Sequence, residues 1–326
     1  MIDPAVFSEL QRLCQRSFPE RLDQRISRIE PLRDARYQGN TFSLSWRSGR
    51  KPEVERLVLR RYGDPWTWWR LEDTEKAQRE WALMRWLYAE GLPVPRVYAA
   101  GSATDDDFVL RADASGHPLI AEGEEGSAQT HARVEALARL LARLHRLVPP
   151  DGERQVLPTV SPEGEVERLR AIADQCADAG LIEVLDELST RKVEARPLCV
   201  LHGSPCSSSV LCDAQGVTAL LNWENSALGD PRWDVARAAS ALHNQQATDL
   251  ADQFCTFYEK DSGQSMADRD FWEALVAAQS WALATWGRTN SDPQEVAQSA
   301  GEALLEQQDS WSERAWRAVT RLRYEN

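Results

Sequence analysis

The sequence predicts an α+β protein with a small β-rich N-terminal part and a larger, mainly helical C-terminal part. Short segments of strand composition dominate residues 25–61. Apolar residues at helical spacing dominate the chain from residue 130 onward, except for one strand–loop–strand pattern within residues 198–236. Such a change from predicted strands to predicted helices along one chain is typical of two parts with separate cores. We place the boundary between residues 115 and 116.

Length, composition and charge are those of an ordinary globular protein with an acidic surface. The chain has 326 residues, of which 42% are hydrophobic and 27% are charged, and its formal net charge is −13. This length is sufficient for two sizeable cores. The negative charge argues against sequence-independent nucleic-acid binding, which needs a surface of Lys and Arg. It leaves a cationic ligand open, although an acidic, solubilising surface explains the charge equally well.

The cysteines and the N-terminus bear on the cellular compartment. The six cysteines form no C-x-x-C pair, and no His cluster has zinc-ligand spacing. We therefore expect reduced thiols and a cytoplasmic protein. No positively charged segment leads into an apolar one, and no apolar run approaches transmembrane length, so we expect no membrane partner.

The N-terminal part is predicted to hold one short helix, a sheet and one long helix. Apolar residues at helical spacing predict the short helix at 5–18 and the long one at 74–90, which Gly91 ends. Turn-forming residues separate the strands. The predicted strands are 26–32, 41–46, 55–61, a strand entered through Pro93 and Pro95, and 108–111.

The C-terminal part is predicted to be a set of helices around the 198–236 pattern. Gly180 is expected to separate two of these helices. His145, at the end of the first, is expected to pack or to cap rather than to catalyse. The predicted helices are 130–146, 163–179, 181–195, 233–243, 249–258, 271–286 and 293–323.

The stretch 198–236 contains a series of motifs at fixed spacing. They are His202-Gly203, Val210-Leu211, Trp223-Glu224, Gly229-Asp230-Pro231 and Asp234. This framework resembles the aminoglycoside phosphotransferase and choline kinase family, which has the protein-kinase-like fold. In that family the loop usually reads His-Gly-Asp, four residues, Asn, then an apolar strand ending Ile-Asp-Trp-Glu, then Gly-Asp-Pro and a downstream Asp, so the framework is present here without a gap. The resemblance implies two lobes: an N-lobe at 1–115 with an antiparallel sheet, and a helical C-lobe at 116–326 that carries the catalytic-type loop.

Three positions depart from the family pattern. The catalytic-base Asp falls on Ser204, the metal-binding Asn on Ser209 and the second metal-binding Asp on Asn222. Phosphoryl transfer requires an oriented acceptor hydroxyl and Mg²⁺ across the phosphates, and Mg²⁺ prefers carboxylate and phosphate oxygens. A missing general base alone costs roughly 10²–10⁴ in rate. The sequence therefore predicts a kinase fold with impaired phosphoryl transfer.

Two further residues fall at nucleotide-binding positions of the family. Leu57-Val58-Leu59-Arg60 lies where kinases carry Val-Ala-Ile-Lys, so that Arg60 replaces the Lys that holds the phosphates. Glu80 lies where a helix carboxylate pairs with that Lys. From the residues alone, Arg60 could equally be an exposed edge-strand residue and Glu80 a solvated helix residue. The resemblance favours the paired interpretation.

His202 and Asp230 survive although the catalytic residues do not. We expect Asp230 to accept hydrogen bonds from the loop backbone and His202 to fix the end of the strand, because buried polar groups need such partners.

Three functions remain open at this point. The first is a pseudokinase, which would be a binding or scaffold protein with little or no phosphoryl transfer. The second is an active but atypical ATP-dependent phosphotransferase of small molecules, in which Glu224, Asp213 or Asp230 binds the metal. The third is another ATP-dependent transfer, for which the sequence gives no positive sign. We favour the first. We then expect ATP and Mg²⁺ to bind weakly at most. The sequence does not identify the small-molecule or protein partner. It is compatible with a homo-oligomer.

Overall fold

The structure is a computed structural model that divides into two compact units. It describes residues 8, 11–12, 15, 25–31, 40–47, 54–62, 76–103, 106–120, 127–245, 247–290 and 308–324. Unit 1 comprises Met1–Gly116 and Thr218–Glu224, and unit 2 comprises His117–Val217 and Asn225–Asn326. Most of the predicted helix at 5–18 and the first half of the one at 293–323 lie outside the described residues.

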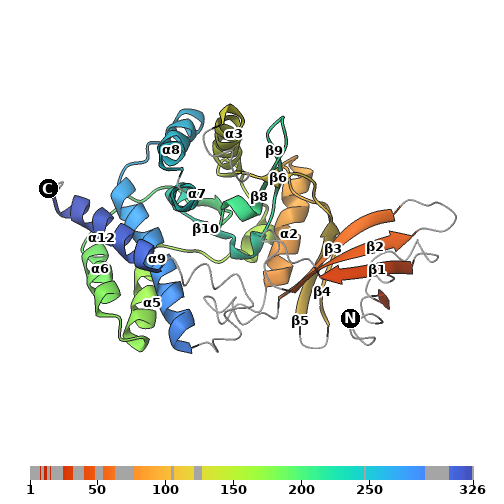
Figure 1. The fold of residues 1–326 in the computed structure, drawn as a ribbon, viewed down its shortest axis with the longest axis horizontal. Coiled ribbons are helices and arrows are strands. Elements are labelled where there is room, and N and C mark those ends of the chain that lie inside the picture. Colours follow the sequence, from red (N-terminus) through yellow and green to blue (C-terminus); the bar gives the residue numbers. More distant parts are fainter. Residues whose placement is uncertain are drawn as a thin grey trace. The chain divides into compact units, whose positions relative to one another are not determined.

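Unit 1 contains the predicted antiparallel sheet (Figure 1). The spatial order of its five strands is β1-β2-β3-β5-β4. Hydrogen bonds to β2 and β5 flank β3 on both sides, so Arg60 lies on the central strand and not on an edge. The strands are β1 (Arg25–Pro31), β2 (Asn40–Arg47), β3 (Val54–Tyr62), β4 (Val97–Ala103) and β5 (Asp106–Ala112).

The helix α2 (Lys76–Ala89) packs on β4 and β5 of this sheet. It buries Leu83, Met84 and Leu87 completely. Gly91 ends it as predicted, with a φ of 71°, and the Leu92 amide donates to the Leu87 carbonyl oxygen at 2.9 Å. Glycine adopts this left-handed conformation without the steric cost that a Cβ brings.

A short segment from the middle of the sequence, Thr218–Glu224, belongs to unit 1. The Leu220 amide donates to the Pro93 carbonyl oxygen at 2.7 Å, and Thr218 Oγ1 donates to the Ser115 carbonyl oxygen at 2.8 Å. The order of residues along the chain alone places this segment with the rest of 198–236. The difference arises from hydrogen bonds to residues more than a hundred positions earlier.

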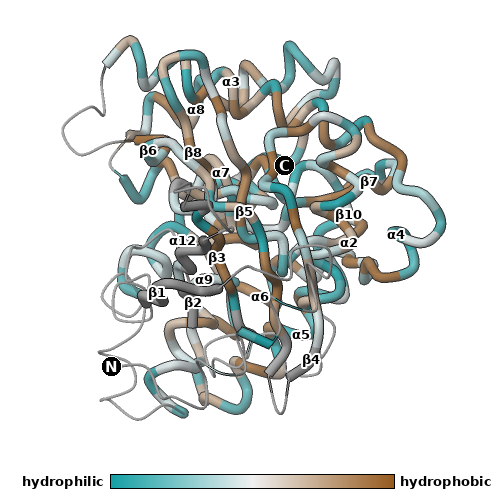
Figure 2. Tube along the Cα trace, turned by 90° about the vertical axis from the view of Figure 1, so that its right-hand side faces the viewer, coloured by the Kyte–Doolittle hydropathy of each residue, from teal (hydrophilic) through white to brown (hydrophobic). Residues whose placement is uncertain are grey.

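Unit 2 is mainly helical, as predicted. Its core contains α9, which packs against α5, α6, α7 and α12 (Figure 1). Hydrophobic and hydrophilic residues alternate along α3 and α8 (Figure 2), as in helices with one buried face. Among the helices that the structure describes, none combines the length and apolar character that a membrane crossing requires. The helices are α3 (Ala128–Leu144), α4 (Asp151–Gln155), α5 (Pro162–Gln175), α6 (Ala179–Ser189), α7 (Pro231–Asn244), α8 (Thr248–Ser262), α9 (Arg269–Asn290) and α12 (Gln308–Tyr324).

The predicted break at Gly180 is wrong. The chain turns three residues earlier, at Ala177, whose φ is 52°, and the Asp178 side chain caps α6 by accepting from the Leu181 amide at 3.1 Å. Gly180 lies inside α6, where a Cβ would meet the ring of Trp281 at 3.0 Å. The N-cap therefore sets the helix start, and the glycine serves close packing. The same helix ends at Ser189 instead of continuing to residue 195.

The strand–loop–strand pattern gives two short strand pairs in unit 2. The strand β7 (Cys199–Leu201) pairs antiparallel with β10 (Ala227–Gly229), and β8 (Val210–Cys212) pairs with β6 (His117–Pro118). Gly229 allows close packing, because a Cβ there would lie 2.7 Å from Leu201 Cδ1 and 2.8 Å from Val160 Cγ2.

Asp230 caps α7 and pairs with a buried arginine. Its Oδ1 accepts from the Arg232 amide at 2.9 Å and from Arg232 Nε at 3.0 Å, while Oδ2 accepts from Nη2 at 2.7 Å. Arg232 is fully buried, lies over the Trp272 ring and also donates to Asp268 at 3.0 Å. The predicted bonds from Asp230 to the loop backbone are therefore wrong, because Arg232 engages both of its oxygens.

We predict that Asp230→Ala destabilises the protein by about 3–5 kcal/mol, because it leaves the buried Arg232 charge without its bidentate partner. The stability of Asp230→Asn should lie between those of the unmodified protein and Asp230→Ala, since asparagine retains a cap acceptor but not the charge. The measurement is the free energy of unfolding in denaturant. Asp174→Ala is the control, because its side chain is 57% exposed and pairs with Arg170 at the surface. Equal effects of the two alanine variants would contradict the role given to Asp230.

Candidate functional site

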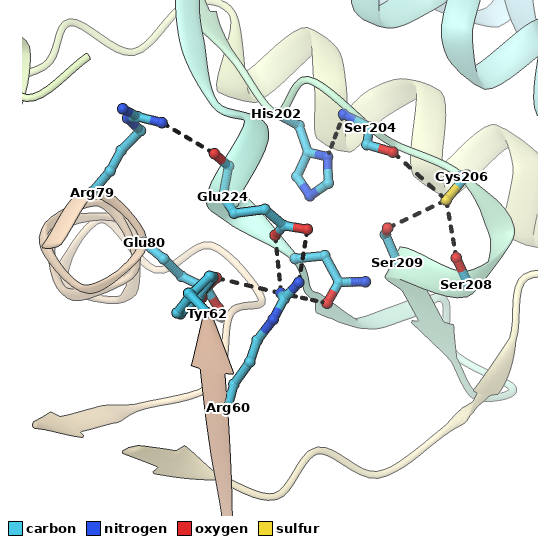
Figure 3. Close-up of polar contacts among 11 residues, drawn as sticks. Arg60, Tyr62, Arg79, Glu80, His202, Ser204, Cys206, Ser208, Ser209 and Glu224 are labelled. Atoms are coloured by element: carbon cyan, nitrogen blue, oxygen red, sulfur yellow. Dashed lines mark hydrogen bonds and ion pairs between the residues drawn. The ribbon is translucent and has the colours of Figure 1, made fainter. Parts of the chain in front are cut away.

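Arg60 lies in the centre of the unit 1 site and is bound by a carboxylate of the same unit. Its Nη2 donates to Glu224 Oε1 at 2.8 Å, and its Nη1 donates to Glu224 Oε2 at 2.9 Å (Figure 3). The two side chains are only 6% and 5% exposed. Two parallel, charge-assisted hydrogen bonds of this kind form the strongest geometry available to an arginine and a carboxylate. The Arg60 guanidinium is therefore bound by a carboxylate of the protein itself, that of Glu224.

Asn222 and Glu80 also contact the guanidinium. Arg60 Nη1 donates to Asn222 Oδ1 at 3.0 Å and lies 3.4 Å from Glu80 Oε2, to which the Tyr62 hydroxyl also donates. The surface alternatives for Arg60 and Glu80 are excluded, since the residues are 5% and 1% exposed. The expected Arg60–Glu80 contact is present, but it is longer than the contact with Glu224, which sequence analysis did not pair with Arg60.

Burial and shared charge set the electrostatics of this cluster. Burial opposes the charge on Arg60, but the carboxylates of Glu224 and Glu80 outweigh it and raise the pKa of the guanidinium. Burial raises the pKa of Glu80, and the negative charge of Glu224 adds to this effect while Arg60 opposes it. Burial and the Glu80 carboxylate raise the pKa of Tyr62 well above its ordinary value. Arg60 thus stays charged, and its charge is neutralised within the protein.

The three acids that the sequence offers as metal ligands all accept hydrogen bonds from the protein. Arg60 binds both Glu224 oxygens, and Arg232 binds both Asp230 oxygens. Asp213 Oδ1 accepts from the amides of Gln215 and Gly216 at 2.7 and 3.1 Å, as in a turn. Within the described part of the chain, no group of three or more His, Cys, Asp or Glu residues is placed to hold a metal.

Asn222, on which the resemblance places the family's second metal-binding Asp, faces a positive charge as well. Asn222 Oδ1 accepts from the Arg60 guanidinium, and Mg²⁺ would require that oxygen to turn toward a second cation instead. The residues present therefore do not fit a Mg²⁺ site.

Asp234 holds the catalytic-type loop in unit 2. Its Oδ2 accepts from the His202 amide at 2.7 Å, and its Oδ1 accepts from the Gly203 amide at 2.8 Å. This is the role that sequence analysis gave to Asp230, four residues earlier. Burial disfavours the Asp234 charge, but the hydrogen bond from His145 and the positive charge that His145 can carry lower the pKa of the carboxyl overall.

His145 and Tyr258 complete this network behind the loop. His145 Nε2 lies 3.3 Å from Asp234 Oδ2, and its Nδ1 lies 2.8 Å from the Tyr258 hydroxyl. Both ring nitrogens therefore have a polar partner, the carboxylate at Nε2 and the hydroxyl at Nδ1. His145 is thus a buried packing residue that also caps α3, as expected. Tyr258 was missed, because no local pattern relates it to a residue 113 positions away.

His202 and Gly203 shape the loop backbone. The Ser204 amide donates to His202 Nδ1 at 3.2 Å, consistent with the predicted fixing role of His202. Gly203 has a φ of 83°, and a Cβ there would lie 2.0 Å from the Asn225 carbonyl oxygen. Only glycine fits this position.

Ser204 and Ser209, on which the resemblance places the family's catalytic base and metal-binding Asn, lie around a thiol (Figure 3). Cys206 Sγ lies 3.9 Å from Ser204 Oγ, 3.4 Å from Ser209 Oγ and 3.0 Å from Ser208 Oγ. Hydroxyl groups carry no charge at working pH, so this loop offers neither a carboxylate base nor an anionic metal ligand.

The structure thus gathers the predicted residues into two groups. Arg60, Glu80 and Asn222 meet in unit 1, together with Glu224. His202, Ser204 and Ser209 lie in the unit 2 loop, whereas Asp230 lies at the start of α7.

Comparison with known proteins identifies the family. The sequence profile of the phosphotransferase enzyme family matches residues 38–275, which is more than half of the chain. An aminoglycoside 3'-phosphotransferase of Streptomyces fradiae is 31% identical over 170 residues, which are 49% of this chain and 62% of that protein. The match therefore spans less than two thirds of that relative's length.

Solved structures show the fold. An aminoglycoside-3'-phosphotransferase of type VIII superposes with a TM-score of 0.57 at 20% identity, covering 83% of this chain and 98% of that one. The choline kinase LicA from Streptococcus pneumoniae superposes with a TM-score of 0.61 at 13% identity, covering 96% and 99%. The two-lobed, kinase-like fold expected from the sequence is therefore confirmed. The chain belongs to the phosphotransferase enzyme family that includes aminoglycoside phosphotransferases and is related in fold to choline kinase.

Proposed function

We propose that this chain is a pseudokinase, a binding or scaffold protein of the family with little or no phosphoryl transfer. The observation that carries the proposal is the engagement of Arg60. In place of a lysine free to hold phosphates, the chain has a guanidinium bound bidentately by Glu224 and contacted by Asn222. Asn222 stands at the family position of a metal-binding carboxylate, so the cation and the residue that would serve the metal satisfy each other.

The loop supports the same function. Ser204 cannot take a proton from an acceptor hydroxyl as a carboxylate does, and the loss of such a base costs roughly 10²–10⁴ in rate. Ser209 contacts the Cys206 thiol and supplies no charge for a metal. These losses affect separate steps, base catalysis and metal binding, so they act together against turnover.

An active, atypical phosphotransferase is the weaker alternative. It requires Glu224, Asp213 or Asp230 to bind the metal. Each of these carboxylates accepts hydrogen bonds from the protein, and two of them are bound by buried arginines. Recruiting Glu224 or Asp230 would leave a buried guanidinium without its partner, which is strongly unfavourable.

We predict no measurable phosphorylation of aminoglycosides or choline by the unmodified protein, the first acceptors to test given its relatives. ATP should bind weakly or not at all. Any binding should have nearly the same affinity with and without Mg²⁺, because carboxylates do not anchor the metal. Calorimetry with ATP in Mg²⁺ or in EDTA, beside a radiolabel transfer assay, measures both. Tight, Mg²⁺-dependent binding with turnover would overturn the pseudokinase proposal.

Restoring the family residues should restore the metal dependence. We expect Ser204→Asp combined with Ser209→Asn and Asn222→Asp to raise the ratio of ADP affinities with and without Mg²⁺ by about tenfold or more, because carboxylate ligands return. The control is Ser204→Asp alone, which restores the family's base but neither of its two metal-binding residues. A ratio that stays near one in the well-folded triple variant would show that the missing ligands do not explain the weak metal response.

A further inference from the structure

Glu224 occupies the face of Arg60 that an anionic ligand would use. A guanidinium binds a phosphoryl group through the same parallel pair of N–H groups with which it binds a carboxylate. We propose that Glu224 is an internal competitor, an autoinhibitory contact that keeps Arg60 closed to phosphoryl groups. This inference rests on the proposed function, because it concerns why the retained cation does not serve a nucleotide.

The position of Glu224 is fixed by more than its carboxylate. Arg79 Nη1 donates to the Glu224 carbonyl oxygen at 3.1 Å. The preceding residue, Trp223, is fully buried, and its indole Nε1 donates to the Leu220 carbonyl oxygen at 2.9 Å. These contacts fix the main chain at Glu224, so its carboxylate is already oriented toward Arg60. A ligand must compete with a partner that has little conformational freedom left to lose.

The charges around Arg60 also oppose an incoming anion. Glu224 and Glu80 both contact the single guanidinium, so the three groups together carry one excess negative charge when all are ionised. Because all three side chains are almost fully buried, solvent screens this charge poorly. Neutralising Glu224 would remove the excess charge and deprive Arg60 Nη2 of its charged partner, while Nη1 keeps its contacts with Asn222 and Glu80.

This contact acts independently of the metal. The replacements at Ser204, Ser209 and Asn222 reduce what Mg²⁺ can add to binding. The Arg60–Glu224 pair reduces phosphate binding with or without Mg²⁺. A change at Glu224 should therefore alter absolute affinity and leave the metal ratio unchanged.

The test uses inorganic tripolyphosphate, which needs no base recognition, in the presence of EDTA. We expect Glu224→Gln to bind it about tenfold more tightly than the unmodified protein, because one buried like charge is removed. Arg60→Gln in the same chain should abolish the gain. Glu167→Gln is the matched control: it removes one negative charge from an exposed position on α5 and should leave affinity unchanged.

Arg60→Lys provides a second test if Glu224→Gln does not fold. An ammonium cannot hold both Glu224 oxygens in the planar bidentate geometry, so this variant loosens the contact and keeps the cation. It should also bind tripolyphosphate more tightly than the unmodified protein. The inference is overturned if the folded variants bind no more tightly, or if the gain survives Arg60→Gln.

The pseudokinase proposal and the role of Glu224 as internal competitor are tested by different outcomes. Transfer activity in the unmodified protein would sink the pseudokinase proposal whatever the variants bind. An inactive protein whose Glu224→Gln variant gains no affinity would leave that proposal standing and remove the internal competitor alone.

Discussion

The buried ion pair between Arg60 and Glu224 is the contact on which the arrangement of unit 1 depends. It joins the central strand of the sheet to a residue 164 positions later. Asn222 accepts from the same guanidinium, and Arg79 donates to the Glu224 carbonyl oxygen. A buried charge that loses its partner costs several kcal/mol, so neither residue can change alone without penalty. The pair constrains the fold and, by the same bonds, occupies the groups that would serve a nucleotide.

Under the proposed function, two different changes bear on phosphoryl transfer. Ser204 and Ser209 offer neutral hydroxyls at the positions where the resemblance expects the catalytic base and a metal ligand. Arg60 retains a positive charge, but its own chain satisfies it. The first change concerns base catalysis and metal binding, and the second concerns access to the cation.

The framework residues have a different physical reason to remain. Asp234 accepts two loop amides, and Asp230 pairs with the fully buried Arg232. Without these carboxylates, buried donors and a buried charge would be left without partners, at a direct cost to folding. These contacts stabilise the family scaffold without involving the side chains of Ser204 and Ser209.

The sequence by itself determined the two-part α+β organisation, most helices and strands, the family framework and the Arg60–Glu80 relation, because these depend on local periodicity or fixed spacing. It misplaced the start of α6, where the Asp178 cap prevailed over the signal of Gly180. It assigned the support of the loop to Asp230, and only the tertiary structure showed that Asp234 provides it. It predicted Glu80 as the partner of Arg60 and did not anticipate the shorter contacts with Glu224. Such choices depend on which distant side chains the fold brings within hydrogen-bond distance, and no local pattern of residues encodes that distance.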